Sequence, residues 1–166
     1  MDDVVSIPSP LGRLTLRPER DDDRAFRYGL FCQSRPPEWD TVPLHPQVRE
    51  ELMRHQFEAQ TKGYRAQFPH ARFDIIELNG APIGRIVVDR PSDMVHLVDQ
   101  AIVPAWRNKG LGTTIMRTLM DEVRARALPL RLMVGSSNDP SLRLYLRLGF
   151  VPIASTPMYI ELEWKG

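Results

Sequence analysis

The residues best suited to chemistry form a basic, glycine-bearing loop at residues 104–113. Arg107 and Lys109 carry positive charge, while Gly110 and Gly112 leave the backbone open to close approach by an anion. An apolar run precedes this loop and an amphipathic helical pattern follows it, so the loop should join a strand to a helix. The unpaired N–H groups and positive dipole end of that helix favour a phosphate ligand.

The spacing of these residues narrows the kind of phosphate ligand. No Gly-Lys-Ser/Thr sequence occurs, which excludes a Walker loop, and Ile115 stands where a dinucleotide-binding fingerprint needs its third glycine. What remains is Arg-x-x-Gly-x-Gly, which resembles the pyrophosphate-binding motif of the GNAT superfamily of N-acetyltransferases. Taken alone, the same pattern also fits an ordinary helix start behind a glycine loop.

A second run of residues, 130–150, matches the other half of the GNAT core. A short apolar strand is followed by a turn at Asn138, a short helix and a Tyr-x-x-x-Gly-Phe sequence at 145–150. The order and separation of the two halves are those of the family. The resemblance covers residues 73–164 well and the N-terminal third only loosely.

The resemblance implies acetyl-CoA as the co-substrate. The strands ending near Val103 and Val134 should splay apart, so that their unpaired backbone groups can pair with the amide-bearing pantetheine arm as with an added strand. The backbone of Ile102 and Val103 is then expected to hold the pantetheine, and the amides of residues 108–113 the pyrophosphate. The expected cofactor-binding residues are Ile102, Val103, Arg107, Asn108, Lys109, Gly110, Leu111, Gly112, Thr113 and Asn138.

Two of these side chains allow a second interpretation. The Thr113 hydroxyl can bind the cofactor or serve the backbone of the helix start. Asn138 fits the family's side-chain contact to the cofactor, and it fits a plain turn residue nearly as well.

The resemblance places Tyr145 in the general-acid position. A phenol with a pKa near 10 stays protonated at neutral pH and can donate its proton to a leaving thiolate. The alternative is a core tyrosine at helical spacing with Leu142 and Leu148.

Asp99 is the candidate base, since it interrupts an otherwise apolar strand. Burial there would raise the pKa of its carboxyl group toward a useful range. It can equally be a structural carboxylate tied to a backbone N–H or to Arg85. His96 and Glu77 are weaker candidates, and some members of the family use no side-chain base.

The amine acceptor is expected near a proline-rich loop at residues 34–45. In the family's layout, the segment between the first two helices borders the acceptor site, which indicates Glu38, Trp39 and Asp40 as acceptor-side residues. The two carboxylates suggest a cationic acceptor. Trp39 can instead simply fix a surface loop.

The order of the expected strands and helices predicts an α+β fold, and the resemblance implies that it is the three-layer GNAT fold. We expect one domain spanning residues 1–166. Its sheet should be mixed and mostly antiparallel, with one parallel, splayed pair and helices on both faces. The expected strands are 13–17, 73–78, 83–90, 96–103, 130–134, 150–154 and 158–164, and the expected helices are 25–33, 46–63, 111–127 and one that starts after Asp139 as N-cap.

Composition limits the other classes of function. A net charge of +1 argues against binding nucleic acid through overall charge, and the histidines show no metal-ligand spacing. The single cysteine, Cys32, fits a reducing compartment. The acidic start at residues 1–3 is not typical of a signal peptide, and no run is long and apolar enough for a membrane span. We therefore expect a cytoplasmic protein that needs no metal.

The sequence thus predicts an N-acetyltransferase. An acceptor amine attacks the thioester of acetyl-CoA directly through a tetrahedral intermediate, with no acyl-enzyme. The acceptor is not defined by the sequence: a small amine, an amino acid, an antibiotic or a protein amine all fit. The alternatives are a non-catalytic acyl-CoA-binding sensor and an interaction module that forms a homodimer through an exposed closing strand.

Overall fold

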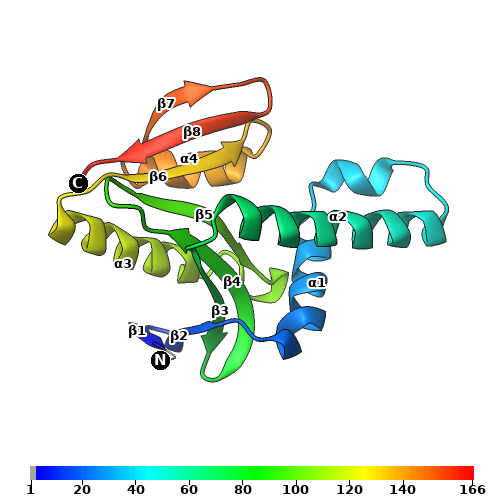
Figure 1. The fold of residues 1–166 in the computed structure, drawn as a ribbon, viewed down its shortest axis with the longest axis horizontal. Coiled ribbons are helices and arrows are strands. Elements are labelled where there is room, and N and C mark those ends of the chain that lie inside the picture. Colours follow the sequence, from blue (N-terminus) through cyan, green and yellow to red (C-terminus); the bar gives the residue numbers. More distant parts are fainter. Residues whose placement is uncertain (1–2) are drawn as a thin grey trace.

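The computed structural model describes residues 3–166, so Met1 and Asp2, part of the start that we did not expect to be a signal peptide, lie outside it. The described chain forms one sheet with helices packed against it (Figure 1). The strands are β1 (Val5–Ser9), β2 (Gly12–Pro18), β3 (Arg72–Leu78), β4 (Ala81–Asp89), β5 (Val95–Ile102), β6 (Leu130–Gly135), β7 (Val151–Ser155) and β8 (Tyr159–Trp164), and the α-helices are α1 (Arg24–Gln33), α2 (Pro46–Gln67), α3 (Leu111–Arg126) and α4 (Asp139–Arg147).

The eight strands lie in the order β1-β2-β3-β4-β5-β6-β8-β7. Every neighbouring pair is antiparallel except β5 and β6, which are parallel. Helix α3 connects these two strands, as expected for a crossover between parallel neighbours. The predicted mixed, mostly antiparallel sheet of the GNAT fold is confirmed.

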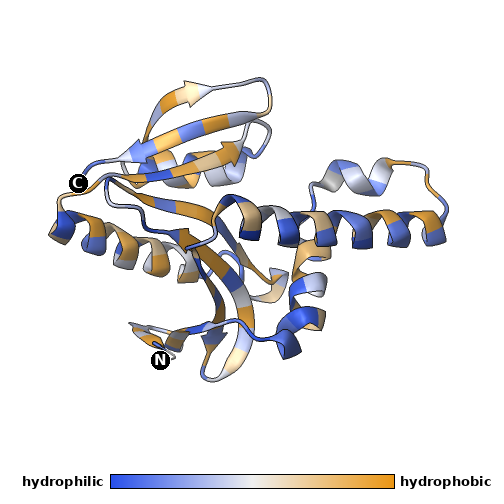
Figure 2. Cartoon of the chain, in the orientation of Figure 1, coloured by the Kyte–Doolittle hydropathy of each residue, from blue (hydrophilic) through white to orange (hydrophobic). Residues whose placement is uncertain are grey.

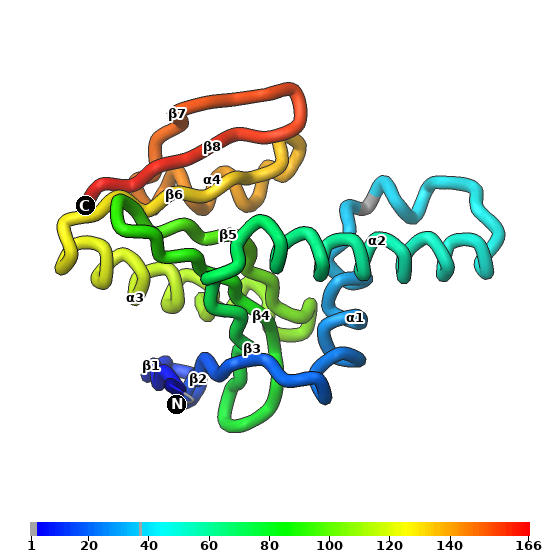
Figure 3. Tube along the Cα trace, viewed as in Figure 1, coloured from blue at the N-terminus to red at the C-terminus, as the bar shows by residue number. Residues whose placement is uncertain are grey.

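Helix α3 covers one face of the sheet and supplies much of the core. Its apolar residues recur at helical spacing, and Figure 2 shows them as bands along the helix. Helix α1 packs against β4 and contacts α2, and Figure 3 shows the connection between α1 and α2 projecting away from the sheet. None of the helices within residues 3–166 is long and apolar enough to cross a membrane. The buried residues of α3 are Leu111, Ile115, Met116, Leu119, Met120 and Val123.

The hairpin between β3 and β4 forms where the sequence predicts it. Asn79 and Gly80 both have positive φ angles, 49° and 86°, as a two-residue turn between twisted strands requires. Gly149, with φ of 98°, follows the last turn of α4 as predicted.

Two details of the prediction were wrong. Strand β1 was not predicted, because Ile7 is its only buried residue and Pro8 interrupts the strand signal. The N-cap of α4 is Asn138 rather than Asp139, since the Asn138 side chain accepts a hydrogen bond from the Ser141 amide at 3.4 Å.

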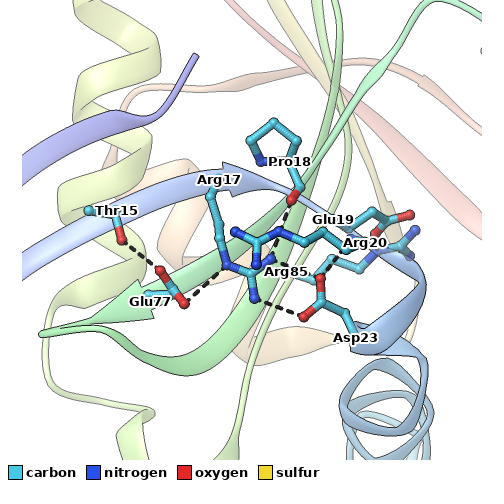
Figure 4. Close-up of polar contacts among 8 residues, drawn as sticks. All are labelled: Thr15, Arg17, Pro18, Glu19, Arg20, Asp23, Glu77 and Arg85. Carbon is cyan, nitrogen blue, oxygen red and sulfur yellow. Dashed lines mark hydrogen bonds and ion pairs between the residues drawn. The ribbon is translucent and has the colours of Figure 1, made fainter. Parts of the chain in front are cut away.

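The acidic run at residues 21–23 has a structural role. Arg17 on β2 donates two hydrogen bonds of 2.8 Å to the Asp23 carboxylate and a third, of 3.1 Å, to Glu77 on β3 (Figure 4). These contacts hold the pKa of Asp23 below its usual value. They attach the start of α1 to the sheet, and they place Glu77 in a structural network.

Candidate active site

The parallel pair separates soon after it forms. Strands β5 and β6 are paired only from Val95 to Leu97, whereas β5 stays beside β4 as far as Ile102 and β6 stays beside β8 as far as Gly135. The register with β4 shifts at Val98, at the start of the separation. The expected splay is therefore present, and the unpaired ends of the two strands border an opening in the sheet.

The backbone groups of β5 divide between its two sides. The Val103 amide donates to the Ile83 carbonyl at 2.8 Å, so this group belongs to the ladder with β4. Because bonded and non-bonded pairs alternate in an antiparallel ladder, the backbone groups of Gln100 and Ile102 point the other way, into the opening. Two residues were expected to hold pantetheine through their backbone. Ile102 directs its backbone groups into the opening, whereas the Val103 amide is used in the ladder with β4.

The glycine loop has the shape expected of an anion cradle. Asn108 and Gly110 both lie in the left-handed region, with φ of 59° and 82°. The first α3 amide with an acceptor in the helix is that of Thr114, which donates to the Gly110 carbonyl at 3.0 Å. The amides at positions 111–113 precede it, and among the described residues no side chain caps this end of the helix.

A groove of about 530 Å³ runs along this loop between β5, α3 and α4. Tyr145 and Arg147 of α4 line its far side, and its size is typical of a ligand pocket. Lys109 is exposed on the loop, and Asn138 borders a neighbouring cavity. The groove collects most of the expected cofactor-binding residues, namely Ile102, Arg107, Asn108, Gly110, Leu111, Gly112 and Thr113.

Arg107 also links the loop to the N-terminal part of the chain. Its Nε donates to the Ile102 carbonyl at 2.7 Å, and its Nη2 donates to the carbonyl of Gln33, the last residue of α1, at 3.2 Å. A guanidinium group at this place satisfies a carbonyl at the C-terminal end of the helix. The side chain therefore fixes the loop against α1 while it borders the groove.

A cavity of about 150 Å³ fills the opening between the splayed strands, and we call it the splay cavity. Tyr145 borders both this cavity and the groove, with its ring packed edge-to-face on Phe150 at 5.6 Å. Burial and the nearby Asp99 carboxylate raise the pKa of Tyr145 to about 12. The hydroxyl is thus protonated at neutral pH, in a side chain that borders both cavities.

Asp99 borders the splay cavity from the β5 side. Burial raises the pKa of its carboxyl group, while the positive charge of Arg85 and the backbone amide of Gln100 act in the opposite direction. Arg85 itself pairs with Glu19, with 3.1 Å between Nε and Oε2. Asp99 and Tyr145 lie within electrostatic reach of each other, since the Asp99 carboxylate contributes to the raised pKa of Tyr145.

Gln100 is a further candidate site residue, which the sequence did not identify. It lines both the groove and the splay cavity, and its buried amide nitrogen has no hydrogen-bond partner within residues 3–166. A buried donor of this kind fits an amide-bearing ligand. The sequence feature that could have identified Gln100 is its polar side chain, next to Asp99 in an otherwise apolar strand.

The predicted acceptor-side residues lie on the loop before α2. Glu38 and Asp40 are exposed, whereas Trp39 stacks against the Arg35 guanidinium at 4.8 Å and its carbonyl accepts from Arg49. Of the weaker base candidates, His96 packs on Phe68, and burial lowers its pKa.

Comparison with known proteins agrees with this geometry. The model of the acetyltransferase (GNAT) family matches residues 35–150. The chain belongs to this family, and it is an acyltransferase. No curated protein matches the chain.

Solved structures share the fold at low sequence identity. The PaiA N-acetyltransferase of Thermoplasma acidophilum, in complex with coenzyme A, has a TM-score of 0.69 at 16% identity, over 92% of this chain and 99% of that one. RimJ of Mycobacterium smegmatis, in complex with CoA-disulfide, has a TM-score of 0.65 at 17% identity, over 97% and 86%. The ribosomal-protein-S18-alanine N-acetyltransferase of Escherichia coli has a TM-score of 0.60 at 20% identity, over 90% and 92%.

Proposed function

We propose that this chain transfers the acetyl group of acetyl-CoA to the nitrogen of a primary amine. The observation that carries the proposal is the continuity of the groove and the splay cavity, which share Gln100, Ser141 and Tyr145. An elongated ligand with a phosphate end and an amide-bearing arm fits that path. The unpartnered Gln100 amide and the uncapped start of α3 supply donors for it.

The binding roles divide along the path. The amides at positions 111–113 hold the pyrophosphate, and the Thr113 hydroxyl, which lines the groove, adds a donor. The backbone of Ile102 pairs with the pantetheine arm as a neighbouring strand would. Asn138 both caps α4 and borders the splay cavity, so its amide NH₂ group can also serve the ligand.

The chemical roles fall to two side chains and the backbone. Asp99 takes a proton from the acceptor ammonium, directly or through water, so that the neutral nitrogen forms the new bond to the acetyl carbon. Backbone N–H groups beside Ile102 stabilise the oxyanion that develops on the acetyl oxygen. Tyr145 donates its proton toward the sulfur as the C–S bond breaks, and the second proton that the nitrogen loses on becoming an amide replaces it. No enzyme nucleophile is needed, because the thioester is already activated.

The test has two stages. Calorimetric titration with acetyl-CoA and with CoA should show micromolar binding, and an amine panel should then release free thiol from acetyl-CoA. Binding without turnover of any amine would favour the acyl-CoA sensor. An absence of binding would refute the cofactor assignment.

A further inference from the structure

A third cavity, of about 130 Å³, lies between α1, α2 and the strands β4 and β5. We call it the acceptor cavity. Asp99 borders both this cavity and the splay cavity, so the two meet at the proposed reaction centre. Along β5, Asp99 and Ala101 face the acceptor cavity, whereas Gln100 and Ile102 face the groove. The acceptor cavity and the groove therefore lie on opposite faces of the sheet.

Buried guanidinium groups with unused donors line the acceptor cavity. Arg27 is only 8% exposed, and its Nε and Nη1 atoms have no hydrogen-bond partner among residues 3–166. The Nε atom of Arg35 is also buried and also has no hydrogen-bond partner among these residues. Buried donors normally have partners, and the guanidinium fork matches a carboxylate in shape and charge. These atoms are therefore suited to bind an anionic group.

The charge around the cavity points the same way. Glu19 contacts three arginines, with distances of 2.5 Å to Arg65, 3.1 Å to Arg85 and 3.8 Å to Arg27, and Figure 4 shows it beside Arg85. Together with Asp99, two carboxylates lie beside these three guanidinium groups, which leaves a small positive excess. Arg35 adds a further positive charge.

Arg35 is held in place by neighbours that do not neutralise it. Its Nη2 donates to the Gln56 side chain at 2.7 Å, and its guanidinium lies 4.9 Å from the ring of Phe31 and 4.8 Å from that of Trp39. These contacts orient the group and leave its charge in place. Trp39 thus supports the acceptor side indirectly, through Arg35.

We propose that the acceptor cavity binds the carboxylate of the acceptor, so that the substrate is an amino acid or another small amine bearing a carboxylate. This inference rests on the proposed acetyl transfer. Arg27 and Arg35 hold the carboxylate, and Asp99, at the side shared with the splay cavity, faces the amine. The cavity volume suits a few heavy atoms rather than a protein segment. The exposed positions of Glu38 and Asp40 give no support to the cationic acceptor suggested by the sequence.

The test compares acceptors that differ only in the carboxylate. Each common L-α-amino acid and β-alanine is assayed beside its carboxamide by thiol release from acetyl-CoA. The wild type should favour the best carboxylate over its amide by roughly 10- to 100-fold in kcat/KM, the usual value of a charge-assisted hydrogen bond. Arg35→Gln should remove most of this preference by slowing the reaction of the acid and leaving that of the amide.

A matched control separates this effect from general loss of charge. Arg54→Gln removes an equal charge from exposed α2 surface, where Arg54 pairs with Glu50 at 2.9 Å, and it should leave both rates unchanged. Arg27→Gln should act like Arg35→Gln. Because Arg27 is buried and its variant can fail to fold, the test is decided by the variant of Arg35, which is only half-buried.

The outcomes distinguish the acceptor class from the reaction. If acetyl-CoA binds and the carboxamides react as well as the acids, or if only amines outside this panel react, the carboxylate assignment is wrong. If acetyl-CoA binds and no amine reacts, the proposed acetyl transfer itself is wrong. If acetyl-CoA does not bind at all, the proposed function itself fails. Titration of the CoA-loaded protein with the best carboxylate gives a readout without turnover, and Arg35→Gln should weaken that binding by the same factor.

Discussion

Replacing Tyr145 by Phe tests the proposed chemistry most directly, because it removes one hydroxyl and keeps the ring. The ring should retain its edge-to-face packing on Phe150, so neither the fold nor the groove should change. With a pKa of about 12, roughly one Tyr145 in 10,000 is ionised at pH 8. The wild-type protein therefore always holds the proton that the variant lacks.

The raised pKa also limits how Tyr145 can act. A simple alkyl thiol has a pKa near 8.5, so complete proton transfer from a phenol with a pKa of about 12 is uphill by roughly 5 kcal/mol. A hydrogen bond to the developing negative charge is worth about 1.5–3 kcal/mol without complete transfer. We thus expect Tyr145→Phe to lower kcat by roughly 10- to 150-fold, at or below the range for full general-acid catalysis.

The assay is steady-state thiol release at saturating acetyl-CoA, with calorimetry for CoA affinity. The variant should bind CoA like the wild type, and wild-type kcat should show no alkaline fall below about pH 10, because the acid remains protonated. Tyr28→Phe is the matched control: it removes a hydroxyl that reaches Glu50 on α2, and it should leave kcat unchanged. A kcat for Tyr145→Phe within twofold of wild type would refute the assigned role.

Three further predictions concern the loop, the base and the structural network. Gly112→Asp should weaken CoA binding at least about tenfold by placing negative charge beside the pyrophosphate. Gly112→Ala should weaken it less, because its Cβ adds no charge and would meet the protein only at ordinary contact distances of 3.7 Å; calorimetry of both variants decides. Asp99→Asn should lower kcat/KM by about 100-fold or more. At pH 7 the free energy of unfolding of Asp99→Asn should equal or exceed that of the wild type, because burial raises the pKa of Asp99 and folding therefore opposes its ionisation. Any advantage of the variant should disappear as the pH falls toward 4, where the carboxyl group becomes protonated in both states. Urea unfolding at both pH values checks this. Asp23→Ala should cost roughly 3 kcal/mol at pH 7 by leaving Arg17 buried without its main partner. Since Arg17 lowers the pKa of Asp23, the difference should shrink as the wild type is acidified below about pH 4, and an undiminished difference in urea unfolding at pH 3 would contradict this reasoning.

Local spacing was sufficient to predict the glycine loop and the strand and helix on either side of it. The apolar strand, the glycines at 110 and 112, and the helical pattern that follows are contiguous in the chain, so their geometry depends mainly on backbone preferences and periodicity. The Asn79-Gly80 hairpin was predictable for the same reason. Strand β1 was not, because a strand with one buried residue carries almost no periodic signal.

The acceptor side could not be predicted in this way. Its cavity joins residues of α1 and α2 with residues of β4 and β5, which are far apart in the sequence. In the sequence Arg27 and Arg35 resemble ordinary surface arginines, and only packing of the helices on the sheet removes their donors from water. The acidic loop residues, which did carry a sequence signal, turned out to be exposed.

The sequence by itself determined the family, most of the strands and helices, and the position of the glycine loop between a strand and a helix, because these follow from local patterns that each segment carries alone. Only the tertiary structure decided where the side chains of the candidate site point and which groups they contact. The bulge at Val98 sets which face of the sheet Asp99 meets, and the approach of α1 turns Arg107 toward the Gln33 carbonyl. Burial and charge are sums over neighbours distant in sequence, and they exist only once the chain has folded.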